Sequence, residues 1–188
     1  MLLDPIVTER LELRVIDLPL VERLLDAPQA IDRPTVPEGW PDEDGRVHLD
    51  RWRGLLLEDG EPSPWRARTV VDRAGHLVGH AGFHGPPQPI EDALSDPTYA
   101  GAIEACDGGA VEVGYTILPS QRRRGLASET LQGLIDWAAA TGRVGTIVAC
   151  VAPTNEGSLA VLRHVGGFER IGRCLDGDLE ELVFRRDL

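Results

Sequence analysis

Residues 111–142 read V-E-V-G-Y-T-I-L-P-S-Q-R-R-R-G-L-A-S-E-T-L-Q-G-L-I-D-W-A-A-A-T-G, and this stretch decides the fold. β-branched and aromatic residues alternate with others from Val111 to Leu118, which predicts a strand that Pro119 ends. From Ala127 onward the apolar residues recur at helical spacing, and Gly142 stands where a helix commonly ends on a left-handed residue. The chain is therefore predicted to pass from a strand into a helix through a turn rich in arginine.

This turn, residues 121–128, is the candidate binding site. Gly125 and Ala127 carry little or no side chain where the helix begins, so a ligand can approach the backbone closely. The unpaired N–H groups of a first helical turn and the positive end of the helix dipole attract anions, phosphate above all. The arginine run 122–124 adds charge and bidentate donors. The spacing fits neither the P-loop nor the dinucleotide-binding glycine motif. A solvated surface turn is the alternative.

The composition limits the classes of function. The chain has 188 residues, of which 27% are charged and 42% hydrophobic, and this is typical of one globular domain covering residues 1–188. The formal net charge is −12, and all 19 basic residues are arginine. Because nucleic-acid binding rests on a broad basic face, this charge disfavours a nucleic-acid partner. The arginine turn is thus a local positive site that suits a small polyanion.

Cysteine usage and the first residues indicate the compartment. Cys106, Cys150 and Cys174 are odd in number and widely spaced, which indicates neither a disulfide framework nor a zinc motif. The start of the chain, M-L-L-D-P-I-V-T-E-R-L, has acidic residues early and no long apolar run. We therefore expect no signal peptide, no membrane partner and a cytoplasmic location.

The remaining pattern predicts a mixed α/β chain. Expected strands cover residues 8–16, 67–72, 76–84, 146–151, 168–174 and 179–185, and expected helices cover 18–26, 46–58 and a segment that begins near Asn155. Residues 28–45 hold four prolines and are expected to be irregular, with Trp40 covering the edge of the core or, alternatively, lining a ligand site. Residues 85–109 form an insertion without a clear period, either a functional loop whose acidic residues attract a cation or a solvated one.

Three histidines, His76, His80 and His84, recur every fourth residue. On a helix this spacing would suit a metal site. On a strand, neighbouring members of the series lie roughly 13 Å apart at about 3.3 Å per residue, which is too far for two of them to share one ion. Because we read this segment as a strand, we expect no metal site.

The order of these elements resembles the GCN5-related N-acetyltransferase (GNAT) fold, a mixed, mostly antiparallel twisted sheet with splayed central strands and flanking helices. The turn is similar to that family's acetyl-coenzyme A signature, Q/R-x-x-G-x-G/A, as Arg122-x-x-Gly125-x-Ala127. The resemblance spans nearly the whole chain and departs mainly in the 85–109 insertion.

Other segments carry the same resemblance. N-x-x-S followed by G-F is present as Asn155, Ser158 and the pair Gly167-Phe168. The opening T-E-R-L-x-L-R and the strand E-V-G-Y-T-I-L-P resemble the subgroup that acetylates ribosomal-protein amino termini and related amines. The resemblance implies that an acceptor amine attacks acetyl-coenzyme A directly in a ternary complex. It is compatible with either a monomer or a homodimer.

The resemblance also implies how the cofactor is held. Backbone N–H groups of the turn would bind the pyrophosphate, and the end of the central strand would pair with the pantetheine arm. For this the central strand and the 146–151 strand must splay apart. The residues implied are Ile117, Leu118, Arg122, Arg123, Arg124, Gly125, Leu126, Ala127, Ser128 and Asn155.

Glu112 is the candidate base. An amine with a pKa near 10 is almost wholly protonated at neutral pH, so a proton acceptor must stand near it. The Cα of Glu112 lies roughly 17 Å from that of Ile117 along an ideal strand, so a bulge or a bridging water must shorten the gap to the thioester. A carboxylate that faces solvent or pairs with an arginine is the alternative, with Glu104 as the next candidate base.

Ser158 is the candidate proton donor. Many family members carry a tyrosine seven residues after the asparagine as general acid, and here that position is Leu162. Ser158 is the remaining polar group, either near the sulfur or on the cofactor, with a plain helix-start hydroxyl as the alternative. The leading function is N-acetyl transfer to a primary amine, either a protein amino terminus or a small amine. The rival is a non-catalytic coenzyme A-binding sensor or interaction module.

Overall fold

The computed structural model describes residues 3–88 and 109–188. The strands are β1 (Ile6–Val7), β2 (Leu11–Val15), β3 (Ala67–Asp72), β4 (Leu77–Phe83), β5 (Ala110–Ile117), β6 (Thr146–Val151), β7 (Glu169–Asp176) and β8 (Leu179–Asp187). The α-helices are α1 (Leu18–Asp26), α2 (Glu43–Asp59), α4 (Leu126–Ala140) and α5 (Glu156–Val165), and the short 3-10 helices are η1 (Pro28–Ala30) and η3 (Pro119–Gln121). The expected element order is confirmed except at the start, where the structure has a short strand β1 that was not expected, and the strand expected over residues 8–16 is β2.

One boundary differs clearly from the expectation. The helix expected from residue 46 begins at Glu43, inside the stretch that we expected to be irregular. The cause is a cap, because the Asp42 side chain accepts a hydrogen bond from the Gly45 N–H at 2.9 Å. Trp40, just before this cap, is buried in the core beside α2, and its expected core role is confirmed.

The strands form a single sheet in the order β1-β2-β3-β4-β5-β6-β8-β7. Each neighbouring pair is antiparallel except β5 and β6, which are parallel. The expected mixed, mostly antiparallel sheet is therefore confirmed. Within the described residues, no helix combines the length and the apolar character that a membrane crossing needs.

The central strands β5 and β6 separate along their length. Their pairing covers Ala110 with Thr146, Val111 with Ile147 and Glu112 with Val148, and it stops there. Both strands continue beyond this point, β5 to Ile117 and β6 to Val151. The expected splay is thus confirmed, and Glu112 lies at its apex.

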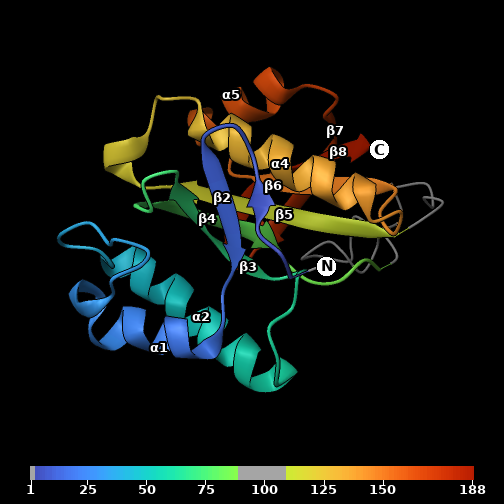
Figure 1. Cartoon of the computed structure of the whole chain (residues 1–188). Helices are drawn as coiled ribbons and strands as arrows, with labels where there is room; N and C mark the ends of the chain where they lie inside the picture. The colour runs from blue at the N-terminus through green and yellow to red at the C-terminus, as the bar shows by residue number, and fades with distance from the viewer. Residues whose placement is uncertain (1–2, 89–108) are drawn as a thin grey trace.

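The helices pack on the sheet in two groups. Figure 1 shows α1 and α2 together at the lower left and α4 and α5 together at the top. The larger core cluster joins Leu131 and Leu134 of α4 to Val111 and Val113 of β5. A second cluster joins the α1–α2 pair to β3 and to the start of β4. Because side chains alternate along a strand, the even-numbered residues of β5 face away from α4.

Candidate functional site

The arginine turn joins β5 to α4 through two left-handed residues. Arg123 has φ 63° and Gly125 has φ 78°, and Gly125 caps the helix. The first helical hydrogen bond runs from the Glu129 N–H to the Gly125 carbonyl at 3.1 Å. The N–H groups of Leu126, Ala127 and Ser128 therefore have no acceptor within the helix and point out of its positive end.

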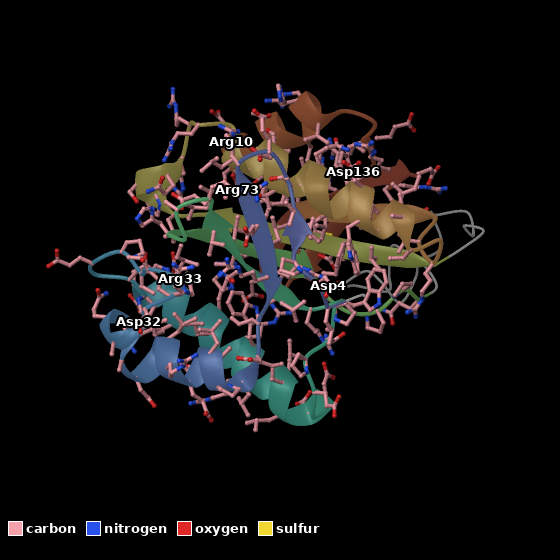
Figure 2. The ribbon with its side chains drawn as sticks, in the orientation of Figure 1. Asp4, Arg10, Asp32, Arg33, Arg73 and Asp136 are labelled. Atoms are coloured by element: carbon pink, nitrogen blue, oxygen red, sulfur yellow. The ribbon has the colours of Figure 1, made fainter. Side chains whose placement is uncertain are left out.

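The turn is supported from behind by the tip of the β1–β2 hairpin, where Arg10 is labelled in Figure 2. The Glu129 carboxylate accepts hydrogen bonds from the Thr8 hydroxyl (2.6 Å), the Arg10 N–H (2.7 Å) and Arg10 Nε (2.6 Å). Arg10 in turn donates from Nη1 to the Arg124 carbonyl at 2.9 Å. These contacts hold the pKa of Glu129 below its usual range, against the opposing effect of burial. The opening T-E-R-L thus fixes the backbone of the turn.

A cleft of about 610 Å³ opens beside the turn, and we call it the turn cleft. Its lining includes the cofactor candidates Ile117, Arg122, Arg123, Gly125, Leu126, Ala127, Ser128 and Asn155. Leu118 and Arg124 do not line it. Leu118 is buried in the second core cluster and donates its N–H to the Val78 carbonyl at 2.9 Å. Arg122 Nε donates to the Ile117 carbonyl at 2.9 Å, which ties the turn to the end of β5.

A second cavity of about 440 Å³, which we call the histidine pocket, lies on the face of β5 that carries its even-numbered residues. Its floor is the cross-strand pair Gly82 and Gly114. Glycine is required at position 82, and at position 114 it leaves room for the His84 ring. A Cβ on Gly82 would lie 2.3 Å from the Arg66 carbonyl, and a Cβ on Gly114 would lie 3.0 Å from His84 Nε2. The missing side chains let the Arg66–Ala67 backbone approach Gly82 and the His84 ring approach Gly114.

Aromatic side chains close one end of the histidine pocket. The His80 ring lies 4.8 Å from the ring centres of both His48 and Trp52, which come from α2. Burial, with a smaller contribution from His48, lowers the pKa of His80 to about 3. Burial and the nearby Arg51 lower the pKa of His48 as well. Both imidazoles are therefore neutral at physiological pH.

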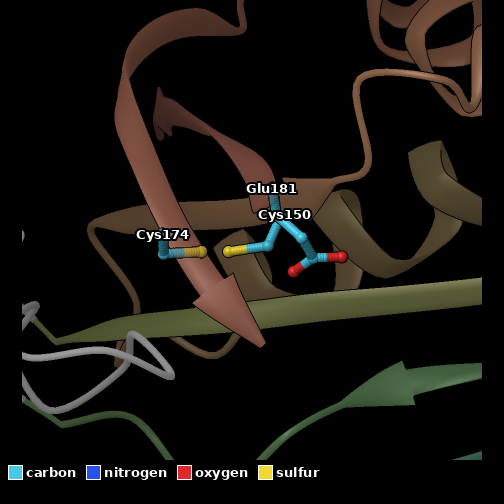
Figure 3. Close-up of side chains that lie close together, drawn as sticks. All are labelled: Cys150, Cys174 and Glu181. Atoms are coloured by element: carbon cyan, nitrogen blue, oxygen red, sulfur yellow. The ribbon is translucent and has the colours of Figure 1, made fainter. Parts of the chain in front are cut away.

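Another part of the wall is acidic and carries the Cys150 thiol. Figure 3 shows Glu181 of β8 and Cys150 of β6, which line the pocket, with Cys174 of β7, which is buried and does not line it; their ligand-type atoms all lie within 4.8 Å of one another. Burial, the neighbouring Asp176 and then Glu112 raise the pKa of Glu181. Burial is the largest of the causes that raise the pKa of the Cys150 thiol, and it favours the protonated form in the metal-free pocket.

Next to these groups the pocket holds a histidine–carboxylate pair. His84 Nδ1 lies 3.3 Å from Glu112 Oε2, and the backbone N–H of His84 donates to the Glu112 carbonyl at 3.0 Å. The side chain of Glu112 is only 5% exposed, whereas that of His84 is 44% exposed. The candidate base therefore lines the pocket, but the imidazole covers it.

The turn cleft and the histidine pocket meet at four shared residues: Tyr115, Thr116, Asn155 and Ser158. Asn155 caps α5 by accepting the Ser158 N–H at 3.0 Å. The Tyr115 hydroxyl donates to the Ser158 carbonyl at 3.4 Å, and burial raises the pKa of Tyr115 to about 12. Leu162, where the resemblance places a tyrosine, is buried in the core. Tyr115, which the sequence analysis missed, brings a phenol to this junction.

The histidines of the sequence pattern make different contacts. His76 Nδ1 pairs with Asp72 Oδ2 at 3.0 Å, His80 packs against α2, and His84 pairs with Glu112. Glu104 lies outside the described residues. The sequence analysis also missed His48 and Trp52. The one signal for the pocket was the pair of glycines inside two predicted strands, since such glycines often mark a close approach of backbone or ligand.

Comparisons with known proteins agree with this geometry. Residues 10–167 match the family described as the acetyltransferase (GNAT) domain. An uncharacterized N-acetyltransferase of Bacillus subtilis, YjdG, is 28% identical over 167 residues, which is 85% of this chain and 86% of that protein.

Solved structures share the fold. A putative GNAT-family acetyltransferase from Bordetella pertussis has a TM-score of 0.64 at 19% identity, covering 97% of this chain and 99% of that one. RimL, a ribosomal L7/L12 α-N-protein acetyltransferase in complex with coenzyme A, has a TM-score of 0.60 at 22% identity, with 98% of each chain covered. The family match covers most of the chain, and the protein therefore belongs to the GNAT family of acyl-CoA-dependent N-acetyltransferases.

Proposed function

We propose that this protein transfers an acetyl group from acetyl-coenzyme A to a primary amine by direct attack in a ternary complex. The observation that carries this proposal is the meeting of two cavities where β5 and β6 separate. One cavity has an anion-binding turn at its rim, and the other has carboxylates in its wall. A thioester lying at the junction is open to a nucleophile from the histidine pocket.

The turn cleft fits coenzyme A. The free N–H groups of the first turn of α4, with Arg123 at the rim of the cleft, suit the pyrophosphate. Beyond Glu112 the edge of β5 that faces β6 has no strand partner, so it is free to pair with the pantetheine amides. Acetyl-coenzyme A supplies the activated acetyl group, and the residues of the cleft bind and orient it.

The histidine pocket suits a cationic acceptor. Glu112, Asp176 and Glu181 stand together in its wall, and the raised pKa of Glu181 reflects their mutual repulsion as well as its burial. A bound ammonium group relieves this repulsion. The acceptor is therefore an amine that arrives protonated, such as the α-amino group of a peptide or a small amine. Glu112 lies in the part of the pocket where the acceptor amine loses its proton.

The junction supplies hydroxyl groups near the departing thiolate. Ser158 is the sequence-derived candidate, and Tyr115 stands beside it. Because the pKa of Tyr115 is raised to about 12, its phenol stays protonated at neutral pH, and its one O–H can turn from the Ser158 carbonyl, 3.4 Å away, to the sulfur. Either group lowers the charge on the sulfur as the C–S bond breaks.

A thiol-release assay tests the proposal. The purified protein is mixed with acetyl-coenzyme A and, in turn, with peptides that carry a free α-amino group, with spermidine and with an aminoglycoside, and free thiol is measured. We expect release that depends on the amine, and a melting temperature that rises with acetyl-coenzyme A concentration. The same peptides with acetylated amino termini are the matched control. Stabilisation by the cofactor without thiol release for any amine would contradict the proposed transfer.

A further inference from the structure

We infer that His84, rather than Glu112 directly, takes the proton from the acceptor amine, and that Glu112 positions its imidazole. This inference rests on the proposed function. It assigns the base by geometry: the imidazole stands between the carboxylate and the open floor of the histidine pocket.

Distance along β5 separates the two groups. The thioester must lie near Tyr115, because the two cavities meet there. Glu112 is three residues from Tyr115, about 10 Å along a strand, whereas Gly114 is its neighbour, at about 3.3 Å. His84 reaches across from β4 and places Nε2 directly over Gly114, 3.0 Å from where a Cβ would stand. The imidazole therefore bridges most of the distance that the carboxylate cannot span.

The contact with Glu112 favours one tautomer of His84. Glu112 Oε2 lies 3.3 Å from Nδ1 of His84, and a carboxylate oxygen beside Nδ1 favours the tautomer that carries its proton there. Neutral His84 then has its lone pair on Nε2, the nitrogen above Gly114. The Glu112 carboxylate also stabilises the imidazolium that forms when Nε2 accepts a proton. His84 is thus the base, and Glu112 orients its ring.

Other groups hold His84 and surround it with charge. Arg66 Nη1 donates to the His84 carbonyl at 2.7 Å, and Arg66 itself pairs with Asp59. Glu181 of β8 interacts electrostatically with His84. Asp176 of β7 and the Cys150 thiol of β6 complete this side of the pocket. The carboxylates around the pocket favour a bound ammonium group.

In the proposed acetyl transfer, each proton and each bond can be assigned to one of these groups. Nε2 takes one proton from the bound ammonium, and the freed nitrogen lone pair forms the N–C bond to the acetyl carbon. The C–S bond breaks and coenzyme A leaves as the thiolate, near Tyr115 and Ser158. The amide nitrogen loses its second proton to solvent, and His84 returns its proton to the thiolate or to solvent. The products are the N-acetyl amine and the free thiol.

A spectroscopic measurement tests the arrangement without turnover. Long-range ¹H–¹⁵N correlation spectra of the histidine-labelled protein, assigned with His84→Ala, report which nitrogen of neutral His84 carries the proton. We expect the Nδ1–H tautomer. The Nε2–H tautomer would overturn the inference, because Nε2 would then have no lone pair for the amine, and this outcome would leave the proposed transfer untouched.

Kinetics with a peptide bearing a free α-amino group test the role. We expect His84→Ala to lower kcat/KM at pH 7 by about 100- to 1000-fold and Glu112→Gln by about 10- to 100-fold, with coenzyme A affinity unchanged. Raising the pH from 7 to 9 should recover only about five- to tenfold of the His84→Ala loss, since a peptide α-amino group with a pKa of about 7.7–8.0 is already mostly free amine at pH 9. Added imidazole should partly rescue His84→Ala but not Glu112→Gln. A merely structural role would give a loss that is constant with pH and not rescued.

Two further variants sharpen the kinetic result. His76→Gln is the matched control, since His76 pairs with Asp72 at the opposite end of β4, and it should retain the parent rate. Gly114→Ala keeps every chemical group but places a methyl 3.0 Å from Nε2, and it should lower kcat by displacing the ring. Parent rates in His84→Ala across the pH range would overturn the inference. If the parent protein does not acetylate the peptide, peptides are not its acceptors. The tautomer measurement would then still test whether Nε2 of His84 is the basic nitrogen.

Discussion

The turn cleft and the histidine pocket share one junction but are built in different ways. The rim of the turn cleft is backbone: free N–H groups, two left-handed residues and a strand edge, mostly within residues 111–128. The working walls of the histidine pocket are side chains that come from α2, β4, β5, β6, β7 and β8. The first depends on local conformation, and the second depends on packing between distant segments.

The chemistry of the two ligands explains why the two cavities are built differently. A pyrophosphate carries the same charge and shape in every acyl-coenzyme A, so a fixed set of backbone donors suffices. An acceptor amine varies in size and in the groups around its nitrogen. Side chains from several elements can change one at a time without disturbing the turn. We therefore expect mutations to separate the functions of the two cavities.

Gly125→Glu should separate the functions of the two cavities most strongly, because it should affect the turn cleft alone. A carboxylate and a side chain then enter the anion site, and coenzyme A affinity should fall by at least about 100-fold, measured by calorimetry. Gly142→Glu is the matched control, since Gly142 lies just past the end of the same helix with φ 64° and no atom within 4 Å of a Cβ. It carries a similar backbone strain without touching the cleft.

The histidine pocket should not respond to the same change. In folded Gly125→Glu, the NMR signals of His84 should match those of the parent. An undiminished coenzyme A affinity would show that the turn is a solvated surface loop, and a disturbed His84 would show that the two cavities are not independent.

Sequence reasoning predicted the two cavities unequally, for the same physical reason. The strand, the turn and the start of α4 follow from local periodicity and from Gly125, so eight of the ten cofactor candidates line the turn cleft. Leu118 was misplaced because its N–H pairs back to Val78 of β4, a tertiary contact. The tip of the β1–β2 hairpin supports the turn through Arg10 and Glu129, which are far apart in sequence.

The histidine pocket could be predicted only in part. Glu112 was found from its place on the central strand, but its partner was not. The 3.3 Å contact between Glu112 Oε2 and His84 Nδ1 depends on the register between β4 and β5, which pairs His80 with Thr116 and Gly82 with Gly114. Periodicity alone presented His84 as one member of a histidine series. The α2 wall, with His48 and Trp52, depends on where that helix packs, and no local pattern encodes this.

A smaller effect should come from Tyr115→Phe, which changes the junction itself. We expect kcat to fall about tenfold, below the usual contribution of a general acid, because a thiolate is already a good leaving group. Since the pKa of Tyr115 is raised to about 12, the ratio of parent to variant rates should stay constant from pH 6 to 9. Coenzyme A affinity should hardly change.

Ser158→Ala is the companion variant for this measurement. If the Ser158 hydroxyl were the group that assists the thiolate, Ser158→Ala would lose more rate than Tyr115→Phe. An unchanged rate in Tyr115→Phe would remove the phenol from the proposed step.

The smallest effect should come from Glu129→Gln. This substitution weakens the contacts between the β1–β2 hairpin and the turn, and it changes no residue that lines either cavity. Glu129 accepts from Thr8 and twice from Arg10, so its loss of charge should lower the free energy of unfolding by about 1–2 kcal/mol at pH 7. Coenzyme A affinity should fall only a few-fold, and the histidine pocket should be unaffected. Glu43→Gln in the exposed first turn of α2 is the matched control.

The pH dependence of this difference follows from the pKa of Glu129. The folded state lowers the pKa of this carboxyl, so the carboxylate stabilises the fold above the unfolded value of about 4.3. The stabilisation is lost as the pH falls through the lower, folded-state pKa. Denaturant unfolding of the parent and of Glu129→Gln should therefore differ fully at pH 7 and converge as the pH falls well below 4.3. A difference that persists unchanged in acid would mean that the substitution acts through packing, and the contacts of Arg10 and Thr8 would then not be what holds the turn.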